Sequence, residues 1–281
     1  MPYEKKDTLL EVTNVTKSYD KKLVIRDVSF SIKDIRRPNM FQGQISALIG
    51  RSGIGKSTLF RMLAGLEQPT SGTIKIFDDK ILRNNIKNNI SSPVPLLPVK
   101  EGDMGVVFQN YIMFSDLTVR QNFQVALNYR PDASKLDKKV FINAYAEEFN
   151  LKEHLDKYPM QLSGGQKQRA AITVQLLNGS PFLLLDEPLS GLDILMIDKI
   201  TALLTKIGQS DELQSIVIVS HDLENCLAIC DTAYILGLEE GKEGAILKKE
   251  ISLLERDLAW RPDIKDLPQF RDTLREVKQL L

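Results

Sequence analysis

The chain has 281 residues, in which 37 lysines and arginines are balanced by 37 aspartates and glutamates. A chain of this length can bury a large core, either as one large domain or as two small ones. Its 43% hydrophobic, 26% charged and 7% aromatic residues exclude a disordered or collagen-like protein. A net charge of zero argues against a protein whose main task is to bind nucleic acid.

Two cysteines, Cys226 and Cys230, are too few for a disulfide framework. They fall on one face of an expected helix that follows His221, so a metal site is conceivable, but two packed thiols are the favoured interpretation. The N-terminus lacks the apolar core of a signal peptide. No apolar run approaches the roughly 18–20 residues that span a bilayer. We therefore expect a reducing compartment and a membrane role only through a partner.

The first hundred residues predict short strands, a loop, a buried strand and a helix. Apolar residues alternate over residues 9–33, as in short strands, and residues 34–43 break this pattern and predict a loop. Residues 44–49 form a buried strand that leads into a glycine-rich turn, and residues 57–65 have the spacing of a helix. Residues 80–103 are rich in Asn, Ser and Pro, which predicts a long surface loop.

The middle of the chain predicts helices and parallel strands. A strand is expected at 105–108, followed by helices within 117–160 and over 166–178. Continuous apolar runs at 182–185 and 215–219 are typical of parallel strands that are covered on both faces. A helix expected at 192–209 lies between these two runs, so together they predict a strand–helix–strand unit.

The tail from about residue 240 is predicted to be a separate extension. Apolar residues recur there at helical spacing; they are Leu267, Phe270, Leu274, Val277 and Leu281. A terminal helix docked on the domain is the favoured interpretation, and a partner or regulatory surface is the alternative.

Residues 50–58, Gly-Arg-Ser-Gly-Ile-Gly-Lys-Ser-Thr, match the phosphate-binding loop G-x-x-x-x-G-K-[ST]. Glycines let the backbone turn sharply and leave room for phosphate, and the following helix presents its positive end. In such a loop Lys56 reaches the β- and γ-phosphates, and Ser57 offers a hydroxyl to Mg²⁺. A strand before the loop and a helix after it favour this interpretation over a simple glycine turn.

Two acids, Asp186 and Glu187, end the apolar run that begins at Phe182. The carboxyl end of a strand is where ligands bind in open α/β sheets. Asp186 would orient Mg²⁺ through water, and Glu187 would polarise the attacking water as a general base. Such a pair is a weak signal alone, but it is a strong one behind a phosphate loop.

The segment Leu162-Ser163-Gly164-Gly165-Gln166 opens the helix expected at 166–178. A serine and two glycines at this point give a second helix N-terminus that can bind an anion. A simple helix cap would explain Ser-Gly-Gly alone. The whole five-residue string in this order is far rarer by chance.

In order and spacing these segments resemble the ATP-binding cassette (ABC) family over residues 9–236. The resemblance also covers Gln109 after its strand, the stretch 190–193 and His221. It implies an α/β fold, a P-loop NTPase of the ABC type with a mainly parallel core sheet, an N-terminal antiparallel β subdomain and a helical subdomain at about 110–162. This ATPase domain would occupy residues 1–239, and the C-terminal extension would occupy residues 240–281.

The resemblance also implies a role for each matching residue. Glu187, His221 and Gln109 would be catalytic, and Ser57, Gln109 and Asp186 would hold Mg²⁺. Tyr19 would stack on adenine, and the remaining nucleotide contacts would come from two segments, one of them belonging to the opposite subunit of a dimer. The residues of those contacts are Gly50, Ser52, Gly53, Gly55, Lys56, Ser57, Thr58, Ser163, Gly164, Gly165, Gln166 and Asp193.

The implied function is that of an ABC transporter's ATPase subunit, which dimerises around two ATP molecules and drives a membrane permease. One cassette without a membrane span looks like the separate subunit of an importer of a small solute or anion. Residues 260–271 loosely resemble the nitrate/sulfonate/taurine branch of such importers. The alternative is a soluble ABC ATPase that acts in regulation, defence or nucleic-acid maintenance.

The resemblance further implies where the protein works and with which partners. The partners would be a second copy of the chain, integral-membrane permease subunits and a solute-binding protein, with no nucleic acid. The location would be cytoplasmic, on the inner face of the cell membrane. Residues 111–114 are apolar and would either receive the permease or belong to the core.

The sequence departs from the family pattern in a few places. Arg51 stands where a proline or asparagine is commoner, and Val174 stands where an arginine is usual. The expected loops 34–43 and 80–103 are longer than is typical. No departure removes a catalytic group, so we expect a competent ATPase.

Overall fold

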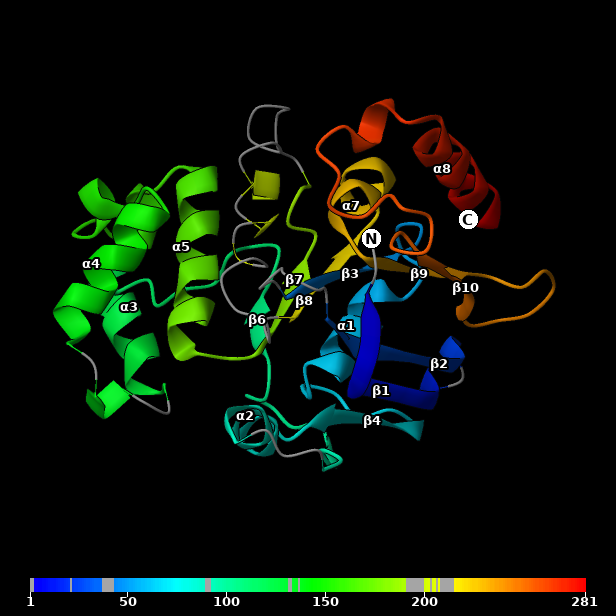
Figure 1. Cartoon of the computed structure of the whole chain (residues 1–281), viewed down its shortest axis with the longest axis horizontal. Helices are drawn as coiled ribbons and strands as arrows, with labels where there is room; N and C mark the ends of the chain where they lie inside the picture. Colours follow the sequence, from blue (N-terminus) through cyan, green and yellow to red (C-terminus); the bar gives the residue numbers. More distant parts are fainter. Residues whose placement is uncertain are drawn as a thin grey trace.

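The fold consists of two β-sheets and a set of helices (Figure 1). The computed structural model describes residues 3–20, 22–36, 43–88, 92–130, 133–135, 137–190, 200–202, 204–205, 207 and 215–281. The predicted α/β class, with a mainly parallel core sheet, an antiparallel N-terminal sheet and a helical part, is confirmed.

The first sheet is antiparallel, with the strand order β2-β1-β4-β5. Its strands are β1 (Glu4–Tyr19), β2 (Lys22–Arg36), β4 (Ser71–Phe77) and β5 (Leu96–Pro98). The prediction of several short strands over residues 9–33 was wrong, because β1 and β2 form one long hairpin. The register of this hairpin shifts at several points, which interrupts the alternation of apolar residues.

The second sheet, called here the main sheet, has the strand order β10-β9-β3-β8-β7-β6. All neighbouring strands run parallel except β10, which is antiparallel to β9. The strands are β3 (Gln44–Ile49), β6 (Gly105–Val107), β7 (Phe182–Asp186), β8 (Ser215–Ser220), β9 (Thr232–Gly237) and β10 (Ile246–Ser252). The carboxyl ends of β3, β8, β7 and β6 therefore meet at one edge.

The main sheet is buried on both faces, as its continuous apolar runs predict. On one face Ile45, Ala47 and Ile49 pack in the core formed with the larger helices. On the other face Leu48 belongs to a second core, which includes the first sheet and α1 (Lys56–Leu63). Residues 200–202, 204–205 and 207 are helical, which agrees with the helix predicted over residues 192–209; the rest of that range lies outside the described residues.

The prediction of a long surface loop over residues 80–103 was wrong. This stretch contains most of α2 (Asp79–Lys87) and all of β5, which pairs with β4. The side chain of Asp78 accepts hydrogen bonds from the N–H groups of Lys80 and Ile81 and so caps the helix. Asn85, only 7% exposed, donates to Ser92. Polar side chains therefore stabilise a helix and the stretch that follows it, in a segment whose composition predicts a loop.

The prediction of a loop over residues 34–43 was also wrong in part. Its first residues continue β2 as far as Arg36, where Arg36 Nε donates to the buried Asp34 carboxylate over 3.0 Å. Residues 37–42 lie outside the described residues.

The helical part contains α3 (Val119–Asn128), α4 (Lys138–Glu148) and α5 (Gly164–Asn178), together with the short 3-10 helices η1 (Ala133–Lys135), η2 (Lys152–His154) and η3 (Pro159–Gln161). In Figure 1 it stands beside the sheets, at the left of the view. Phe123 and Leu127 of α3 are fully buried within it. The helix-rich character predicted for residues 117–160 is confirmed.

The end of the chain packs against the main sheet. β10 extends that sheet, and α8 (Pro268–Leu280) lies against α7 (Leu223–Ile229) and β9, after the short helix η4 (Ile264–Asp266). Phe270 and Val277 anchor α8 in the core, which confirms the predicted terminal helix. The predicted boundary at residue 239 stays a prediction, although β10, beyond it, is part of the main sheet.

The two cysteines are buried and free, in agreement with the packed-thiol interpretation. Burial raises the pKa of the Cys226 thiol far above its usual range. Within the described ranges, no helix is long and apolar enough to cross a membrane.

Candidate functional site

The phosphate-loop motif forms an open turn between β3 and α1. Gly53 and Gly55 adopt φ angles of 77° and 111°, in the region that favours glycine. A side chain on Gly53 would meet nothing within 4 Å, whereas a Cβ on Gly55 would come within 2.9 Å of Val24 Cγ1. The loop therefore leaves an open cradle at Gly53 and is packed tightly against β2 at Gly55. Ser52 and Ser57 are exposed, and Gly50 and Thr58 are buried.

Lys56 points back into this turn from the first position of α1. Its Nζ donates to the carbonyls of Gly50 and Arg51 over 2.9 and 3.1 Å. The side chain is only 7% exposed, and Nζ lies 3.6 Å from Oε1 of Glu187. A buried ammonium group next to an open cradle can balance the charge of a bound anion.

Glu187 follows β7 and lies at the centre of the candidate site. Oε2 accepts from the Ser220 hydroxyl over 2.8 Å, and Oε1 lies 2.9 Å from Nδ1 of His221. Because a carboxylate can only accept, Nδ1 of His221 carries the proton in this contact. The backbone of Glu187 has φ 49°, and its N–H donates to the Val219 carbonyl over 2.8 Å. A non-glycine residue adopts this backbone conformation at a cost of about 1–3 kcal/mol. Residues with such strained backbones are found most often at functional sites.

Three residues whose side-chain oxygens could bind a metal ion lie at the same edge of the main sheet. Asp186 ends β7, Ser57 is the second residue of α1, and Gln109 stands two residues after β6, whose Val107 pairs with Leu185. Burial, followed by the neighbouring Glu187 carboxylate, raises the pKa of Asp186. Hydroxyl, amide and carboxylate oxygens are the hard ligands that Mg²⁺ prefers. Among the described residues no group of three His, Cys, Asp or Glu is placed to hold a metal.

Tyr19 ends β1 and is 39% exposed. Its hydroxyl donates to the Glu67 carboxylate and accepts from Arg61 Nη2 over 3.4 Å. Arg61 also reaches Thr58 Oγ1 of the phosphate loop, over 3.5 Å. Burial would raise the pKa of Glu67, but hydrogen bonds from Tyr19, Lys17 and Arg61 outweigh it and lower the pKa to about 2. Arg61 and Glu67 thus link Tyr19 to the loop.

The signature segment 162–166 caps α5. The Ser163 N–H donates to Gln166 Oε1 over 2.9 Å, and the Gln166 N–H donates to Ser163 Oγ over 3.4 Å. This reciprocal pair is a capping box, and it leaves Ser163 and Gly164 exposed at the start of the helix. Within the described residues, the signature makes no hydrogen bond or ion pair with the phosphate loop of the same chain.

His154, which the sequence analysis does not select, supports this cap. Its Nε2 lies 3.0 Å from Nε2 of Gln166. Because Gln166 Oε1 already accepts from Ser163, the Gln166 amide donates and His154 Nε2 accepts. The proton of a neutral His154 is therefore on Nδ1, which is buried without a hydrogen-bond partner.

A buried side chain of α5 contacts the segment that follows Glu187. Gln168 is fully buried, and its Nε2 donates to the carbonyl of Pro188. The helix that presents the signature and the strand that presents Glu187 are thus attached to each other through one side chain.

The structure brings most of the predicted residues to two places. Residues of the phosphate loop, Asp186, Glu187 and His221 gather at the carboxyl edge of the main sheet, and Gln109 stands there after β6. Tyr19 joins the loop through Arg61. The signature residues, including the buried Gly165, lie at a separate place, the start of α5. Asp193 lies outside the described residues.

Comparisons with known proteins agree with this geometry. The profile of the ABC transporter family matches residues 36–190, which is more than half of the chain. The chain belongs to the ABC transporter family. It is 33% identical, over 229 residues, to the spermidine/putrescine import ATP-binding protein PotA of Spiroplasma citri. It is also 33% identical, over 232 residues, to the sulfate/thiosulfate import ATP-binding protein CysA of Escherichia coli K12.

The two alignments each cover 81% of this ABC chain, but only 59% of PotA and 57% of CysA. The chain therefore spans less than two thirds of the length of these relatives. They do not bear on the finer resemblance to the nitrate/sulfonate/taurine branch, which stays a prediction.

Solved structures share the fold. The dimeric structure of the bacterial ABC transporter cassette MJ0796 has a TM-score of 0.62 and 25% identity, and the match covers 87% of this chain and 99% of that one. CbiO1 from Clostridium perfringens, part of the CbiONQ transporter complex, has a TM-score of 0.66 and 24% identity, covering 96% of this chain and 100% of that one.

Proposed function

We propose that this chain is the ATP-binding and ATP-hydrolysing subunit of an ABC importer. The observation that carries the proposal is the meeting of Lys56, Glu187 and His221 beside an open phosphate cradle. Lys56 is poised to exchange two backbone carbonyls for phosphate oxygens. A bound γ-phosphate would separate Lys56 from Glu187, which leaves Glu187 free to accept a proton from the attacking water.

His221 and Ser220 support this base. Both donate to the Glu187 carboxylate, so they fix its orientation during proton transfer. Ser57, Gln109 and Asp186 would hold Mg²⁺ together with phosphate oxygens, and the ion would neutralise charge on the phosphates. The raised pKa of Asp186 supports this assignment, since a nearby cation would compensate the burial of its carboxylate.

The signature implies a dimer with shared sites. Ser163 and Gly164 are exposed at a helix N-terminus that bonds nothing in the phosphate loop of its own chain. A second copy, placed head to tail, would bring this helix end to the γ-phosphate of the first copy. The separation of the two anion sites within one chain supports this arrangement, as do the dimeric MJ0796 cassettes.

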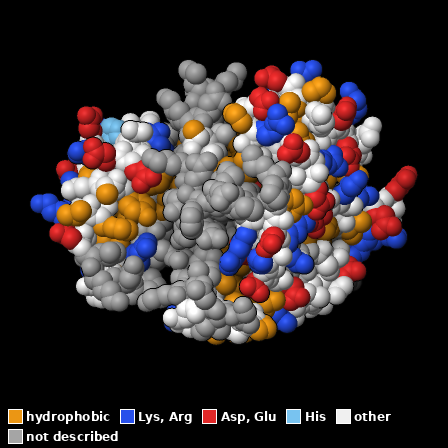
Figure 2. All heavy atoms as spheres, in the orientation of Figure 1, with side chains coloured by type: hydrophobic (Ala, Val, Ile, Leu, Met, Phe, Trp, Pro, Cys, Tyr) orange, Lys and Arg blue, Asp and Glu red, His pale blue; other side chains and the backbone are white. Residues whose placement is uncertain are grey.

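The apolar segment 111–114 supports a permease partner. Ile112 and Phe114 are 61% and 58% exposed, although the adjacent Tyr111 and Met113 pack against the core. Asn122, only 2% exposed, fixes the segment by accepting from the Phe114 N–H and donating to the carbonyls of Phe114 and Leu117. Further hydrophobic side chains are visible on the helical part, at the left of Figure 2. A rigid segment that exposes large apolar groups fits a protein interface.

The location follows from this partner: the chain would lie on the cytoplasmic face of the cell membrane, attached to permease subunits that receive cargo from a solute-binding protein. The reported relatives carry cargo of opposite charge, polyamines and sulfate. They therefore do not select the solute.

Hydrolysis of ATP by the purified chain tests the first part of the proposal. Lys56→Ala removes the buried ammonium and should abolish turnover. The exposed Lys152→Ala, which loses only a surface ion pair with Glu147, is the matched control and should hydrolyse ATP normally. Near-normal turnover by Lys56→Ala would exclude the phosphate-loop assignment.

Co-purification with a co-expressed permease tests the second part. Phe114→Ser should lose the permease and keep the hydrolysis of the free subunit. Tyr129→Ser, at a side chain 77% exposed and outside segment 111–114, is the control. Retention of the permease by Phe114→Ser would mean that the partner docks elsewhere.

A further inference from the structure

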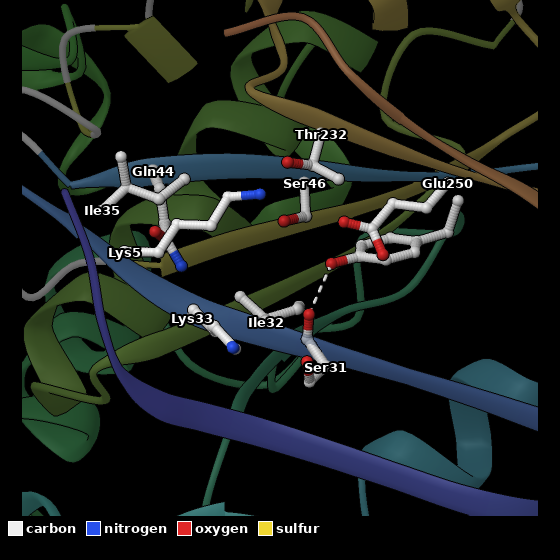
Figure 3. Close-up of a pocket in the computed structure, with 10 residues that line it drawn as sticks. Lys5, Ser31, Ile32, Lys33, Ile35, Gln44, Ser46, Thr232 and Glu250 are labelled. Carbon is white, nitrogen blue, oxygen red and sulfur yellow. Dashed lines mark hydrogen bonds between the residues drawn. The ribbon is translucent and has the colours of Figure 1, made fainter. Parts of the chain in front are cut away.

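Five buried side-chain polar atoms among the described residues have no hydrogen-bond partner. Three of them belong to Gln44 and Ser215, which are register partners on β3 and β8. Gln44 projects towards a cavity of about 190 Å³ between the two sheets (Figure 3), where water can satisfy its amide. The other two atoms are His154 Nδ1 and Gln168 Oε1. His154 contacts the signature residue Gln166, and Gln168 follows the signature in α5.

Gln168 lies two residues after the signature segment and is fully buried. Its Nε2 donates to the carbonyl of Pro188. A carbonyl can only accept, so the amide nitrogen must face Pro188 and the amide oxygen must face the other way. Oε1 has no donor on that side. An unpaired buried oxygen costs free energy, so the stability of the fold alone would not favour glutamine at this position.

The hydrogen bond from Gln168 joins α5 to the turn that carries Glu187. Pro188 is buried and follows Glu187 directly. Within the described part of the chain, no other hydrogen bond or ion pair connects α5 with residues 186–190. The helix itself stands between the rest of the helical part and the main sheet (Figure 1), and it packs against β6. One side chain therefore links the signature helix to the segment of the proposed base.

The main sheet holds Glu187 from the other side. The Glu187 N–H donates to the Val219 carbonyl over 2.8 Å, and Oε2 accepts from the Ser220 hydroxyl over 2.8 Å. The backbone of Glu187, with φ 49°, is strained. A strained conformation persists only where the surrounding structure fixes it from several sides. The bond from Gln168 to Pro188 fixes this turn from the side of α5.

We propose that Gln168 is a positioning residue for Glu187, the base of the proposed ATP hydrolysis, on which this inference rests. Gln168 holds the Pro188 carbonyl and, through it, the backbone of Glu187. A misplacement of about 1 Å can cost about 10²-fold in rate, and a positioned base contributes about 10²–10⁴-fold. Gln168 bonds no described residue of the phosphate loop. Loss of its bond should therefore lower kcat and leave ATP binding unchanged.

Steady-state ATP hydrolysis by the purified chain tests the proposal. Gln168→Met keeps about the same side-chain length but has no donor for Pro188. We expect kcat to fall at least about tenfold, with KM for ATP within about twofold of the parent value. Thr173→Val is the matched control, because Thr173 is also buried in α5 but its hydroxyl donates to Arg169 of the same helix over 2.8 Å. This control should hydrolyse ATP normally.

Gln168→Met should fold as well as the parent. The substitution leaves the Pro188 carbonyl without its donor, but it also removes the unpaired Oε1. The melting temperature should therefore change little, so misfolding cannot account for a loss of kcat. ATP-dependent dimerisation in a Glu187→Gln background should also be unchanged, because the cap formed by Ser163 and Gln166 does not involve Gln168.

Hydrolysis in the Glu187→Gln background separates positioning from a merely structural role. Without the base there is nothing for Gln168 to position, so adding Gln168→Met should leave the residual rate unchanged. A structural defect would instead lower this residual rate by the same factor as it lowers the rate of the parent.

Three results would overturn the inference. They are a kcat of Gln168→Met within about twofold of the parent value, an equal loss of rate in the Glu187→Gln background, or a dimer that weakens in step with kcat. The last would mean that Gln168 supports the signature and not the base. A parent chain that does not hydrolyse ATP would refute the proposed function and this inference with it. An active parent and a fully active Gln168→Met would refute this inference alone.

Discussion

His154→Leu should weaken the ATP-dependent dimer without weakening the fold. The substitution removes the acceptor that holds the Gln166 amide, 3.0 Å away, and so frees one side of the Ser163 cap. In the parent this bond orders the cap already in the free chain; in the variant the cap must be ordered when the dimer forms, at a cost of up to about 0.5–1.5 kcal/mol, the contribution of one hydrogen bond. A dimer has two signatures, so the loss is about 1–3 kcal/mol, or about a 5- to 150-fold rise in the dimer dissociation constant.

The fold should respond in the opposite direction. His154 Nδ1 is buried without a partner, and leucine removes this unmade hydrogen bond. This gain offsets the loss of the hydrogen bond to Gln166, so the melting temperature of the monomer should stay equal or rise. ATP affinity of the monomer should not change, because the phosphate loop is untouched.

Sedimentation in a Glu187→Gln background, where ATP is consumed only slowly, measures the dimer dissociation constant directly. His154→Gln is the matched variant: its amide oxygen can accept from Gln166, so dimerisation should recover in large part. A His154→Leu protein that dimerises as tightly as the parent would refute the argument, as would equal losses in both variants.

Two further predictions concern Tyr19 and its partner Glu67. Tyr19→Ala should raise KM for ATP and leave kcat nearly unchanged. Stacking contributes about 1–3 kcal/mol and holds the base equally in the ground and transition states. A collapse of kcat in steady-state assays would contradict this prediction. The pKa of Glu67 is about 2 against 4.5 when unperturbed, so its contribution to stability is present above pH 4.5 and is lost as pH falls towards 2. Glu67→Gln should therefore lower the free energy of unfolding at pH 7 and flatten its pH dependence between pH 4.5 and 2. Urea unfolding at several pH values measures both effects. An unchanged pH dependence would refute the stabilising role of the hydrogen bonds to Glu67.

The sequence predicts most of the site because its groups are local motifs or strand ends. The phosphate loop, Asp186 and Glu187 can be found from chain order alone, since parallel strands bring their carboxyl ends to one edge. His154, Arg61 and Glu67 could not be found in this way, because each acts through a side chain that only the fold brings near. The contact of Gln168 with Pro188 could not be found either, since a glutamine in a helix is ordinary until its burial is known.

The fold was harder to predict where polar residues do structural work. The sequence analysis missed α2 and β5 because the stretch that contains them is rich in Asn and Pro. Side-chain hydrogen bonds of Asp78 and Asn85 stabilise this stretch, and composition does not reveal them. The β1–β2 hairpin looked like several short strands because its register shifts break the period of two. The terminal helix was visible because a regular apolar stripe, with Phe270 and Val277 at its centre, docks it.

The central claim is that one chain's phosphate loop and another chain's signature share each ATP. Glu187→Gln keeps the size of the side chain and one acceptor oxygen for Ser220 but removes the base, which should slow hydrolysis by about 10²–10⁴-fold. Light scattering with ATP should then detect a stable dimer, and ADP should leave monomers. Adding Ser163→Arg at the exposed helix end should abolish the dimer while each monomer still binds ATP. A Glu187→Gln, Ser163→Arg protein that still dimerises on ATP would contradict the account.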